Sequence, residues 1–308
     1  MVEAETAGDP MSEQKWIRSS LRKLMKALAE KGHWVSHTTI GRLLKEMKYS
    51  LKANEKRIAG ADHPDRDRQF QYIEEQKQAF LAAGLPAISI DTKKKELIGN
   101  FKNAGRVWCQ KAEAVNDHDF EQNALGRAVP YGIYDLAHNL GYVYVGNSAD
   151  TPQFAVDCIV RWWKTEGCHL YPTAQRILIL ADAGGSNGCR PRLWKHQLQE
   201  QLADILGLEV TVCHYPTGAS KWNPIEHRLF GPISTNWAGE PLRTFEFMLA
   251  CIRGTMTETG LSVKAFLVDQ LYATGIRISK QVMQTLQIEL HEVCPRWNYT
   301  IKPRLVST

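Results

Sequence analysis

Apolar residues repeat with a helical period in the first part of the chain. Between Gln14 and Gly32 they are spaced by three and four positions, which predicts a short amphipathic helix that ends at the glycine. The same spacing returns from Ile40 to Met47. Two short helices joined by a brief turn predict a helix-turn-helix. Residues 1–13 lack such a pattern and are expected to form a tail or linker.

The periodicity changes further along the chain. Residues 50–64 contain Gly60 and Pro64 and read as a linker, and a helical pattern follows over 65–83. Beyond Pro86, short apolar runs alternate with helical patterns. The predicted strands cover 87–91, 96–101, 131–136, 141–146, 176–181 and 209–213, and the predicted helices cover 151–165, 190–206 and a segment that starts at Asn223.

The order of these elements indicates the fold class. Antiparallel strands come first, and helices then alternate with strands, which predicts an α/β (α+β) fold with a mixed sheet flanked by helices. This is the element order of a ribonuclease-H-like domain. The predicted plan is a tail over 1–13, a helix-turn-helix DNA-binding domain over 14–60, a linker helix over 61–84, a catalytic core over 85–240 and a C-terminal helical part over 241–308.

Composition excludes several classes of protein. With 308 residues, 44% hydrophobic and 23% charged, the chain can bury a large core and does not resemble a disordered protein. Its seven cysteines are scattered without a Cys-x-x-Cys pair, which argues against a disulfide framework and leaves Cys168-His169 without further zinc ligands. No apolar run reaches the roughly 20 residues of a membrane helix. The polar, acidic start is no secretion signal, so we expect a cytoplasmic, nucleoid-associated protein.

Charge adds a candidate nucleic-acid surface. The net charge is only +5, but the stretch from Lys15 to Lys56 is strongly basic, as suits a phosphate backbone. The second predicted helix would expose four groups able to contact base edges or phosphates: Thr38, Thr39, Arg42 and Lys45. A plain helical hairpin with a solvated basic face is the alternative interpretation.

Three acidic residues follow strands or begin a helix. Asp91 ends an apolar run and is followed by the lysines 93–95. Asp182 ends the most apolar strand and precedes the small residues 183–188, which would allow close approach of a substrate. Glu226 occupies the third helical position of Asn223-Pro-Ile-Glu226, where a capping box is the structural alternative. Solvated or capping turns are the alternatives for the two aspartates.

The chain order brings these carboxylates to one edge of the sheet, since a helix and a strand separate Asp182 from Glu226 and return the chain to the same end. Such carboxylates would hold two Mg²⁺ ions about 3.5–4 Å apart for phosphodiester chemistry. Candidate phosphate ligands, with a solvated surface as the alternative, are Lys93, Lys94, Lys221 and Arg228. For His214 and His227 we favour ordinary polar contacts over assistance at the scissile phosphate.

Four stretches carry a resemblance to a known family: Ser89–Phe101, Gly126–Asp135, Leu180–Gly188 and His214–Phe230. Together they resemble the DDE transposases of bacterial insertion sequences, in the group with the Rhodopirellula-type transposase DDE domain, and Asn223-Pro-Ile-Glu226 is similar to the third-carboxylate motif of mariner-like enzymes. The likeness covers nearly the whole chain. The spacing from Asp182 to Glu226 is longer than in the mariner-like relatives.

The resemblance implies a ribonuclease-H-like fold and a catalytic, metal-binding triad of Asp91, Asp182 and Glu226. It implies two Mg²⁺ or Mn²⁺ ions, with DNA cleavage followed by strand transfer. The implied partners are the element's terminal inverted repeats and target DNA, bound by a homo-oligomer, with no membrane.

Members of this group usually carry more N-terminal DNA-binding sequence, so we expect a truncated copy or fragment. Two alternatives to an active transposase therefore stay open: a non-catalytic DNA-binding remnant, and a metal-dependent nuclease without strand transfer.

Overall fold

A computed structural model describes residues 6–8, 15–17, 20–50 and 64–304 of the chain. The chain divides into two compact units, residues 1–58 and 59–308, and each is treated by itself. Most of the predicted tail and of the linker over 50–64 lies outside the described residues. Within the described part, no helix is both long and apolar enough to cross a membrane.

The first unit contains two capped helices, α1 (Leu21–Glu30) and α2 (His37–Glu46). The Ser20 and Ser36 hydroxyls accept hydrogen bonds from backbone N–H groups of the following turns, which stabilises both helix starts. Gly32, at a φ of 82°, ends the first helix as predicted. The prediction that this helix starts at Gln14 is wrong, because Lys15–Ile17 (β2) pairs with Thr6–Gly8 (β1) as a strand.

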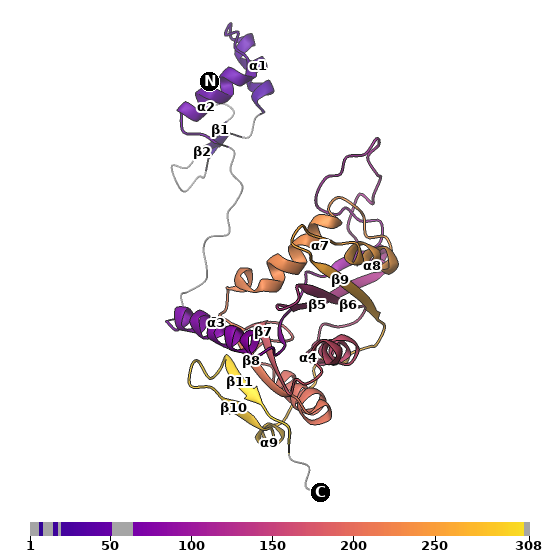
Figure 1. Cartoon of the computed structure of the whole chain (residues 1–308). Helices are drawn as coiled ribbons and strands as arrows, with labels where there is room; N and C mark the ends of the chain where they lie inside the picture. The colour runs from indigo at the N-terminus through magenta and orange to yellow at the C-terminus, as the bar shows by residue number, and fades with distance from the viewer. Residues whose placement is uncertain (1–5, 9–14, 18–19, 51–63, 305–308) are drawn as a thin grey trace. The chain divides into compact units, whose positions relative to one another are not determined.

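A nine-stranded mixed sheet forms the second unit (Figure 1). Its strand order is β10-β11-β8-β7-β3-β5-β6-β9, with β4 paired to β5 beside this path. The pairs β3–β7, β7–β8 and β6–β9 are parallel, and the others are antiparallel. The strands are β3 (Ala87–Thr92), β4 (Glu96–Ile98), β5 (Gly126–Asp135), β6 (Leu140–Gly146), β7 (Arg176–Asp182), β8 (Glu209–Tyr215), β9 (Ser262–Val268), β10 (Ile288–Leu290) and β11 (Asn298–Ile301).

Helices cover both faces of this sheet. One face packs on α4 (Pro152–Trp162), η3 (Trp163–Gly167), α6 (Arg192–Gln197) and η4 (Leu198–Asp204). The other packs on α3 (Arg66–Ala82), η6 (Glu226–Phe230), α7 (Gly231–Asn236) and α8 (Phe245–Arg253). Four short elements complete the described part of the unit: η2 (Glu121–Asn123), α5 (Cys168–Leu170), η5 (Ser220–Trp222) and α9 (Lys280–Gln284).

The predicted fold class is confirmed. Strand β5 runs antiparallel between β3 and β6, and β7 and β8 extend the sheet on the other side of β3, which is the ribonuclease-H-like arrangement. The predicted strands and helices between residues 65 and 215 are present. The helix predicted to link the two domains, α3, packs on the sheet through the buried side chains of Ile73 and Phe80.

The helical prediction for residues 241–308 is wrong in part. This segment contains α8 and a short helix, α9 (Lys280–Gln284), but also the strands β9, β10 and β11. In β9, buried Val263 and Ala265 alternate with exposed Ser262 and Lys264, which is the period of a strand and not of a helix. The sheet therefore draws strands from both sides of the predicted boundary at residue 240.

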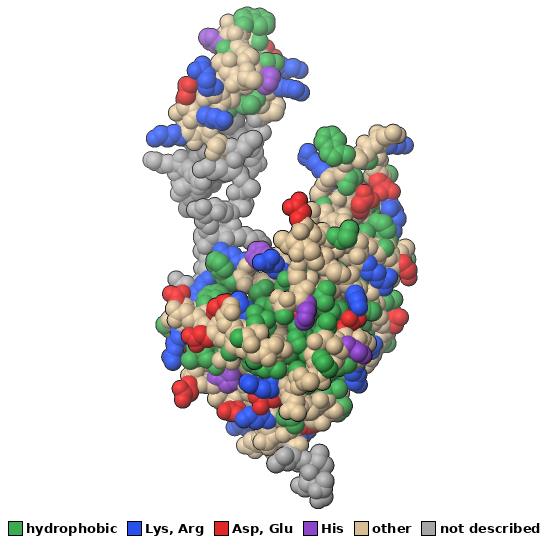
Figure 2. All heavy atoms as spheres, in the orientation of Figure 1, with side chains coloured by type: hydrophobic (Ala, Val, Ile, Leu, Met, Phe, Trp, Pro, Cys, Tyr) green, Lys and Arg blue, Asp and Glu red, His purple; other side chains and the backbone are tan. Residues whose placement is uncertain are grey.

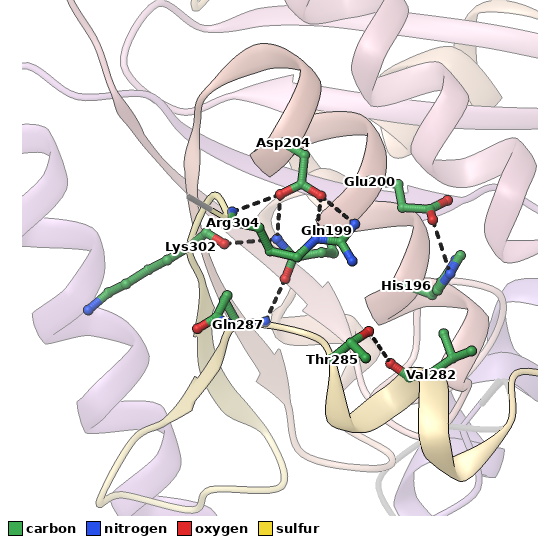
Figure 3. A network of polar contacts seen from close by, with 9 residues as sticks. All are labelled: His196, Gln199, Glu200, Asp204, Val282, Thr285, Gln287, Lys302 and Arg304. Atoms are coloured by element: carbon green, nitrogen blue, oxygen red, sulfur yellow. Dashed lines mark hydrogen bonds and ion pairs between the residues drawn. The ribbon is translucent and has the colours of Figure 1, made fainter. Parts of the chain in front are cut away.

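A buried glutamine connects η4 to the last strands (Figure 3). The Gln199 amide donates 2.8 Å hydrogen bonds to Asp204 Oδ1 and to the Lys302 carbonyl, and its oxygen accepts one of 2.8 Å from the Gln287 N–H. Arg304 pairs with the same Asp204 carboxylate at 2.6 Å. These contacts fix the segment after β11 against the helical layer.

We predict that Gln199→Ala lowers the free energy of unfolding by about 1–3 kcal/mol, because it removes the three hydrogen bonds of a fully buried amide with Asp204, Gln287 and Lys302. Urea unfolding measures this loss. Lys302→Ala is the matched control, since it removes only an exposed ion pair with Glu289 and should leave the stability nearly unchanged. Equal free energies of unfolding for Gln199→Ala and the parent would mean that the Gln199 hydrogen bonds do not stabilise the fold.

Candidate active site

The first two acids of the predicted triad lie at the carboxyl ends of neighbouring parallel strands. Ile90 of β3 pairs with Ala181 of β7, so the next residues, Asp91 and Asp182, follow each other in register. Adjacent strands lie about 4.8 Å apart, and in-register side chains of parallel strands point to the same face. Both aspartates therefore project toward the face covered by η6.

The third acid arrives on the helix that follows Asn223. Glu226 stands in its first turn, and the helix packs against β5 at Gly132. A Cβ on Gly132 would lie 2.5 Å from the Phe230 ring and 2.9 Å from Ile225 Cδ1, so only glycine allows this approach. Since Gly132 pairs with Asp91 across the strands, the helix is held beside the aspartates.

The sequence pattern predicted Asn223 as the N-cap of this helix. The helix does start just after Asn223, but the Asn223 side chain does not cap it. The buried amide instead donates hydrogen bonds to Asp182 Oδ1 at 3.0 Å and to the Ile90 carbonyl at 3.3 Å. Its oxygen accepts a short hydrogen bond from Ser89 Oγ, which itself accepts one of 3.1 Å from the Ile225 N–H. This Ser89–Asn223 network joins β3, β7 and the third-acid helix.

Electrostatics couple the three acids. Burial, and then repulsion from Asp182, raises the pKa of Asp91 to about 8. Burial and Asp182 also raise the pKa of Glu226, and the charges of Lys93 and His227 oppose this shift. An acid that is buried among other acids favours a bound proton or cation.

A fourth acid at this edge was missed by the sequence analysis. The Asp150 carboxylate accepts a 3.3 Å hydrogen bond from Thr92 Oγ1, lies 3.5 Å from Lys95 Nζ and contributes to the raised pKa of Asp91. It directly precedes Thr151, the N-cap of α4. In the sequence, a polar residue just before a predicted helix is interpreted as part of a turn. Only the three-dimensional position of Asp150 shows that it lies at the same edge as the other acids.

The donor set suits a hard divalent cation, because carboxylate oxygens are the preferred ligands of Mg²⁺. Asp91 and Asp182 are the residues that would hold it first, with Glu226 beside them. In the part of the chain that the structure describes, however, no three His, Cys, Asp or Glu side chains come close enough together to ligate one ion. The acids therefore share one edge without forming a preassembled cage.

The predicted phosphate ligands differ in their surroundings. Lys93 is buried, lies 3.3 Å from Glu96 and stacks over the Trp237 ring at 4.6 Å, while burial lowers its pKa. Lys94 and Arg228 are exposed, and exposed Lys221 lies over the Trp222 ring at 5.0 Å. Lys93 thus serves as an internal countercharge near Glu226, whereas the other three face solvent.

The predicted DNA-binding residues of the first unit lie on or beside α2. Arg42 and Lys45 are exposed, and Arg42 pairs with Glu46 at 3.3 Å. The Thr38 and Thr39 hydroxyls lie 2.7 and 2.9 Å from Ser36 Oγ at the helix start. Figure 2 shows Lys and Arg side chains on the visible face of this unit.

His214 makes structural contacts, as the sequence analysis favoured. Its Nδ1 lies 2.9 Å from the Asp182 carbonyl, which can only accept, so Nδ1 carries the proton. Nε2 then accepts from the Tyr299 hydroxyl at 3.2 Å, and Trp194 donates to that hydroxyl at 2.9 Å. Burial lowers the pKa of His214 to about 4, which keeps the ring neutral. His227 donates to the Lys221 carbonyl.

Residues 1–303 match the family described as the Rhodopirellula transposase DDE domain. The chain belongs to this transposase family. The match spans both units and includes all four stretches that carry the resemblance in the sequence. No curated protein matches the chain in sequence.

Solved structures of Mos1 transposase are similar to this chain at low identity. A Mos1 paired-end complex with the left transposon end is 14% identical, with a TM-score of 0.43 over 77% of this chain and 71% of that one. The Mos1 strand transfer complex is 13% identical, with a TM-score of 0.43 over 74% and 63%. The mariner Mos1 paired-end complex with Mg is 14% identical, with a TM-score of 0.44 over 78% and 72%.

We predict that Asn223→Ala lowers the free energy of unfolding by about 1–3 kcal/mol, because Ser89, Ile90 and Asp182 each lose a buried partner. It should also weaken Mg²⁺ binding about 10–100-fold, since an oriented carboxylate loses its support. Calorimetric titration and urea unfolding measure the two effects. Asn147→Ala is the matched control, because that exposed amide also donates to a carboxylate, Asp269. Unchanged stability in Asn223→Ala would refute the network.

A second prediction concerns pH. His214 has a folded pKa of about 4 against an ordinary value of 6.5, so the unfolded chain binds the extra proton between these values. Its contribution to stability is therefore complete above pH 6.5 and is lost as the pH falls to about 4, by roughly 3 kcal/mol at most. His214→Gln should remove this dependence, so the stability gap between parent and variant narrows in acid. If urea unfolding gives parallel curves of unfolding free energy against pH for the parent and for His214→Gln, the prediction is wrong.

Proposed function

We propose that this chain is a DDE transposase that cleaves DNA at the ends of an insertion sequence and transfers the free strand to target DNA. The observation that carries the proposal is the edge formed by Asp91 and Asp182, in register on parallel strands, with Glu226 on the adjoining helix. Membership of the transposase family supports the same function.

The acids and their surroundings have separate roles in this proposal. Asp91, Asp182 and Glu226 would hold two divalent cations, Mg²⁺ or Mn²⁺, and when bound these would activate the attacking oxygen and stabilise the leaving one. Asn223 and His214 orient Asp182 through its side chain and its carbonyl. Lys93 limits the repulsion at Glu226. Lys94, Lys221 and Arg228 contact DNA phosphates.

The chemistry has two displacements at phosphorus. In the first, a water oxygen forms a bond to the scissile phosphorus, the bond to the 3′ oxygen breaks, and that oxygen leaves as a 3′-hydroxyl after taking a proton. In the second, this 3′-hydroxyl attacks a target phosphodiester and releases a new 3′-hydroxyl there. Each step exchanges one P–O bond for another, so no external energy source is required.

The first unit supplies DNA recognition in this proposal. The N-capped helix α2 presents Arg42 and Lys45 to solvent, where they can reach phosphates or base edges, with Thr38 and Thr39 near its start. The partners are the terminal inverted repeats and target DNA, bound by a homo-oligomer of this chain. The similar Mos1 structures include a complex with a transposon end.

One observation favours a second candidate, a DNA-binding remnant without catalysis. Among the described residues, the acids form no group of three that could hold an ion as they stand. A remnant would bind DNA through α2 and never cleave it. A nuclease without strand transfer uses the same acids and differs only in the second displacement.

The test is Mg²⁺-dependent cleavage and strand transfer of a duplex that carries the terminal repeat flanking the gene. The parent chain should produce a free 3′ end and then a joined product. Asp182→Ala should lower the cleavage rate by about a thousandfold or more, as removal of key catalytic groups does. Product analysis on sequencing gels measures both steps.

The control is Asp157→Ala, which removes an acid on α4 that pairs with Arg161. It should cleave as the parent does. A parent chain that binds the duplex but never cleaves it would establish the remnant, and cleavage without joining would establish the nuclease.

A further inference from the structure

A cavity of about 410 Å³ opens beside the acid edge, a size typical of small-ligand sites. The cavity is lined by the lysine run 93–95 and by the turn 185–187 that follows β7. Asp91 and Asp150 also line it. The cavity is thus continuous with the acid edge but has polar walls of its own.

The turn presents a buried amide with an unused donor. Asn187 is only 1% exposed, and its Nδ2 has no hydrogen-bond partner among the described residues. Its Oδ1 lies 3.5 Å from Ser186 Oγ. A buried amide donor without a partner costs about 1–3 kcal/mol, so this group is suited to a ligand that accepts hydrogen bonds.

The glycines of the turn hold this amide in place. Gly185 adopts a φ of 76°, and the Gly188 N–H donates to the Gly185 carbonyl at 3.3 Å. A Cβ on Gly188 would lie 2.7 Å from the Ala183 carbonyl oxygen, so the turn is tightly closed. Gly184 has open space where a side chain would be, which leaves its backbone accessible. The turn can therefore take a ligand against its backbone.

The charges decide the class of ligand. Asp150 is already bonded to Lys95 and Thr92, whereas exposed Lys94 adds a positive charge at the rim. An anion with several acceptor oxygens satisfies both Lys94 and the Asn187 donor, and cations on the acid edge would reduce its repulsion by Asp91. We propose that this cavity binds one backbone phosphate of the DNA strand next to the cleaved bond, with Asn187 Nδ2 and Lys94 Nζ as the hydrogen-bond donors. The inference rests on the proposed function for its ligand.

The experiment measures binding separately from cleavage. The probe is the terminal-repeat duplex, in which single phosphates near the cleaved bond are replaced one at a time by neutral methylphosphonates. Asn187→Ala should weaken binding of the unmodified duplex roughly tenfold or more, as expected for a hydrogen bond to a charged group. At one position, the methylphosphonate should weaken duplex binding by the parent but should cause no further loss of affinity in Asn187→Ala.

Lys94→Ala tests the charge of the pocket. It should lower the slope of log affinity against log salt by about one, whereas Asn187→Ala should leave that slope unchanged. Asn147→Ala and Lys164→Ala are matched controls at exposed positions outside the cavity, and both should bind as the parent does. Thermal unfolding confirms that the variants fold, and Asn187→Asp provides an isosteric replacement if the alanine does not.

Two results would overturn the inference. One is that the loss of affinity caused by the methylphosphonate adds to the loss caused by Asn187→Ala at every position, which would mean that Asn187 contacts no phosphate. The other is weaker Mg²⁺ binding by Asn187→Ala than by the parent in the absence of DNA, which would make the turn a cation ligand. Failure of the proposed function has a different signature, because a parent chain that never cleaves can still show the coupling between Asn187 and a single phosphate.

Discussion

The pairing of β3 with β7, locked by the Ser89–Asn223 network, is the interaction on which the rest of the site depends. The register sets the two aspartates side by side, and Asn223 bonds to one strand through Ile90 and to the other through Asp182. The backbone carbonyl of Asn223 accepts a 3.1 Å hydrogen bond from the Glu226 N–H, which begins the turn that carries Glu226. Three segments far apart in the sequence therefore share one small set of buried hydrogen bonds, and none can shift without breaking them.

This arrangement is electrostatically unfavourable in the folded chain, because it places four acids near one another. Asp91, Asp182, Glu226 and Asp150 gather at one partly buried edge, where burial and then repulsion from Asp182 raise the pKa of Asp91. Lys93 offsets part of this at Glu226, and it can do so only because Glu96 and Trp237 hold the ammonium in the interior. The neutral ring of His214 fixes the Asp182 backbone without adding charge.

Much of this was predictable from the sequence because short-range patterns decide it. The apolar runs before Asp91 and Asp182, the glycine at the end of α1 and the proline after Thr151 each specify local structure. Asp150 and the partners of Asn223 were not predictable, since their roles arise from neighbours more than 40 residues away. The strand β9 was missed although Val263 and Ala265 alternate with polar residues, because its flanking segments read as helices. The triad assignments themselves stay predictions.

Strand β11 makes the acid edge depend on a segment that follows it by more than 70 residues in the sequence. Strand β11 pairs with β8, and its Tyr299 supports the histidine that holds the Asp182 carbonyl. During synthesis, domains fold as their residues leave the ribosome, so the earlier strands can assemble while residues 298–301 are still inside it. The backbone at the acid edge would then gain its support only after β11 has left the ribosome. A product interrupted before this strand would lack the Tyr299 contact with His214, so the acid edge of the earlier strands depends on a segment that is synthesised later.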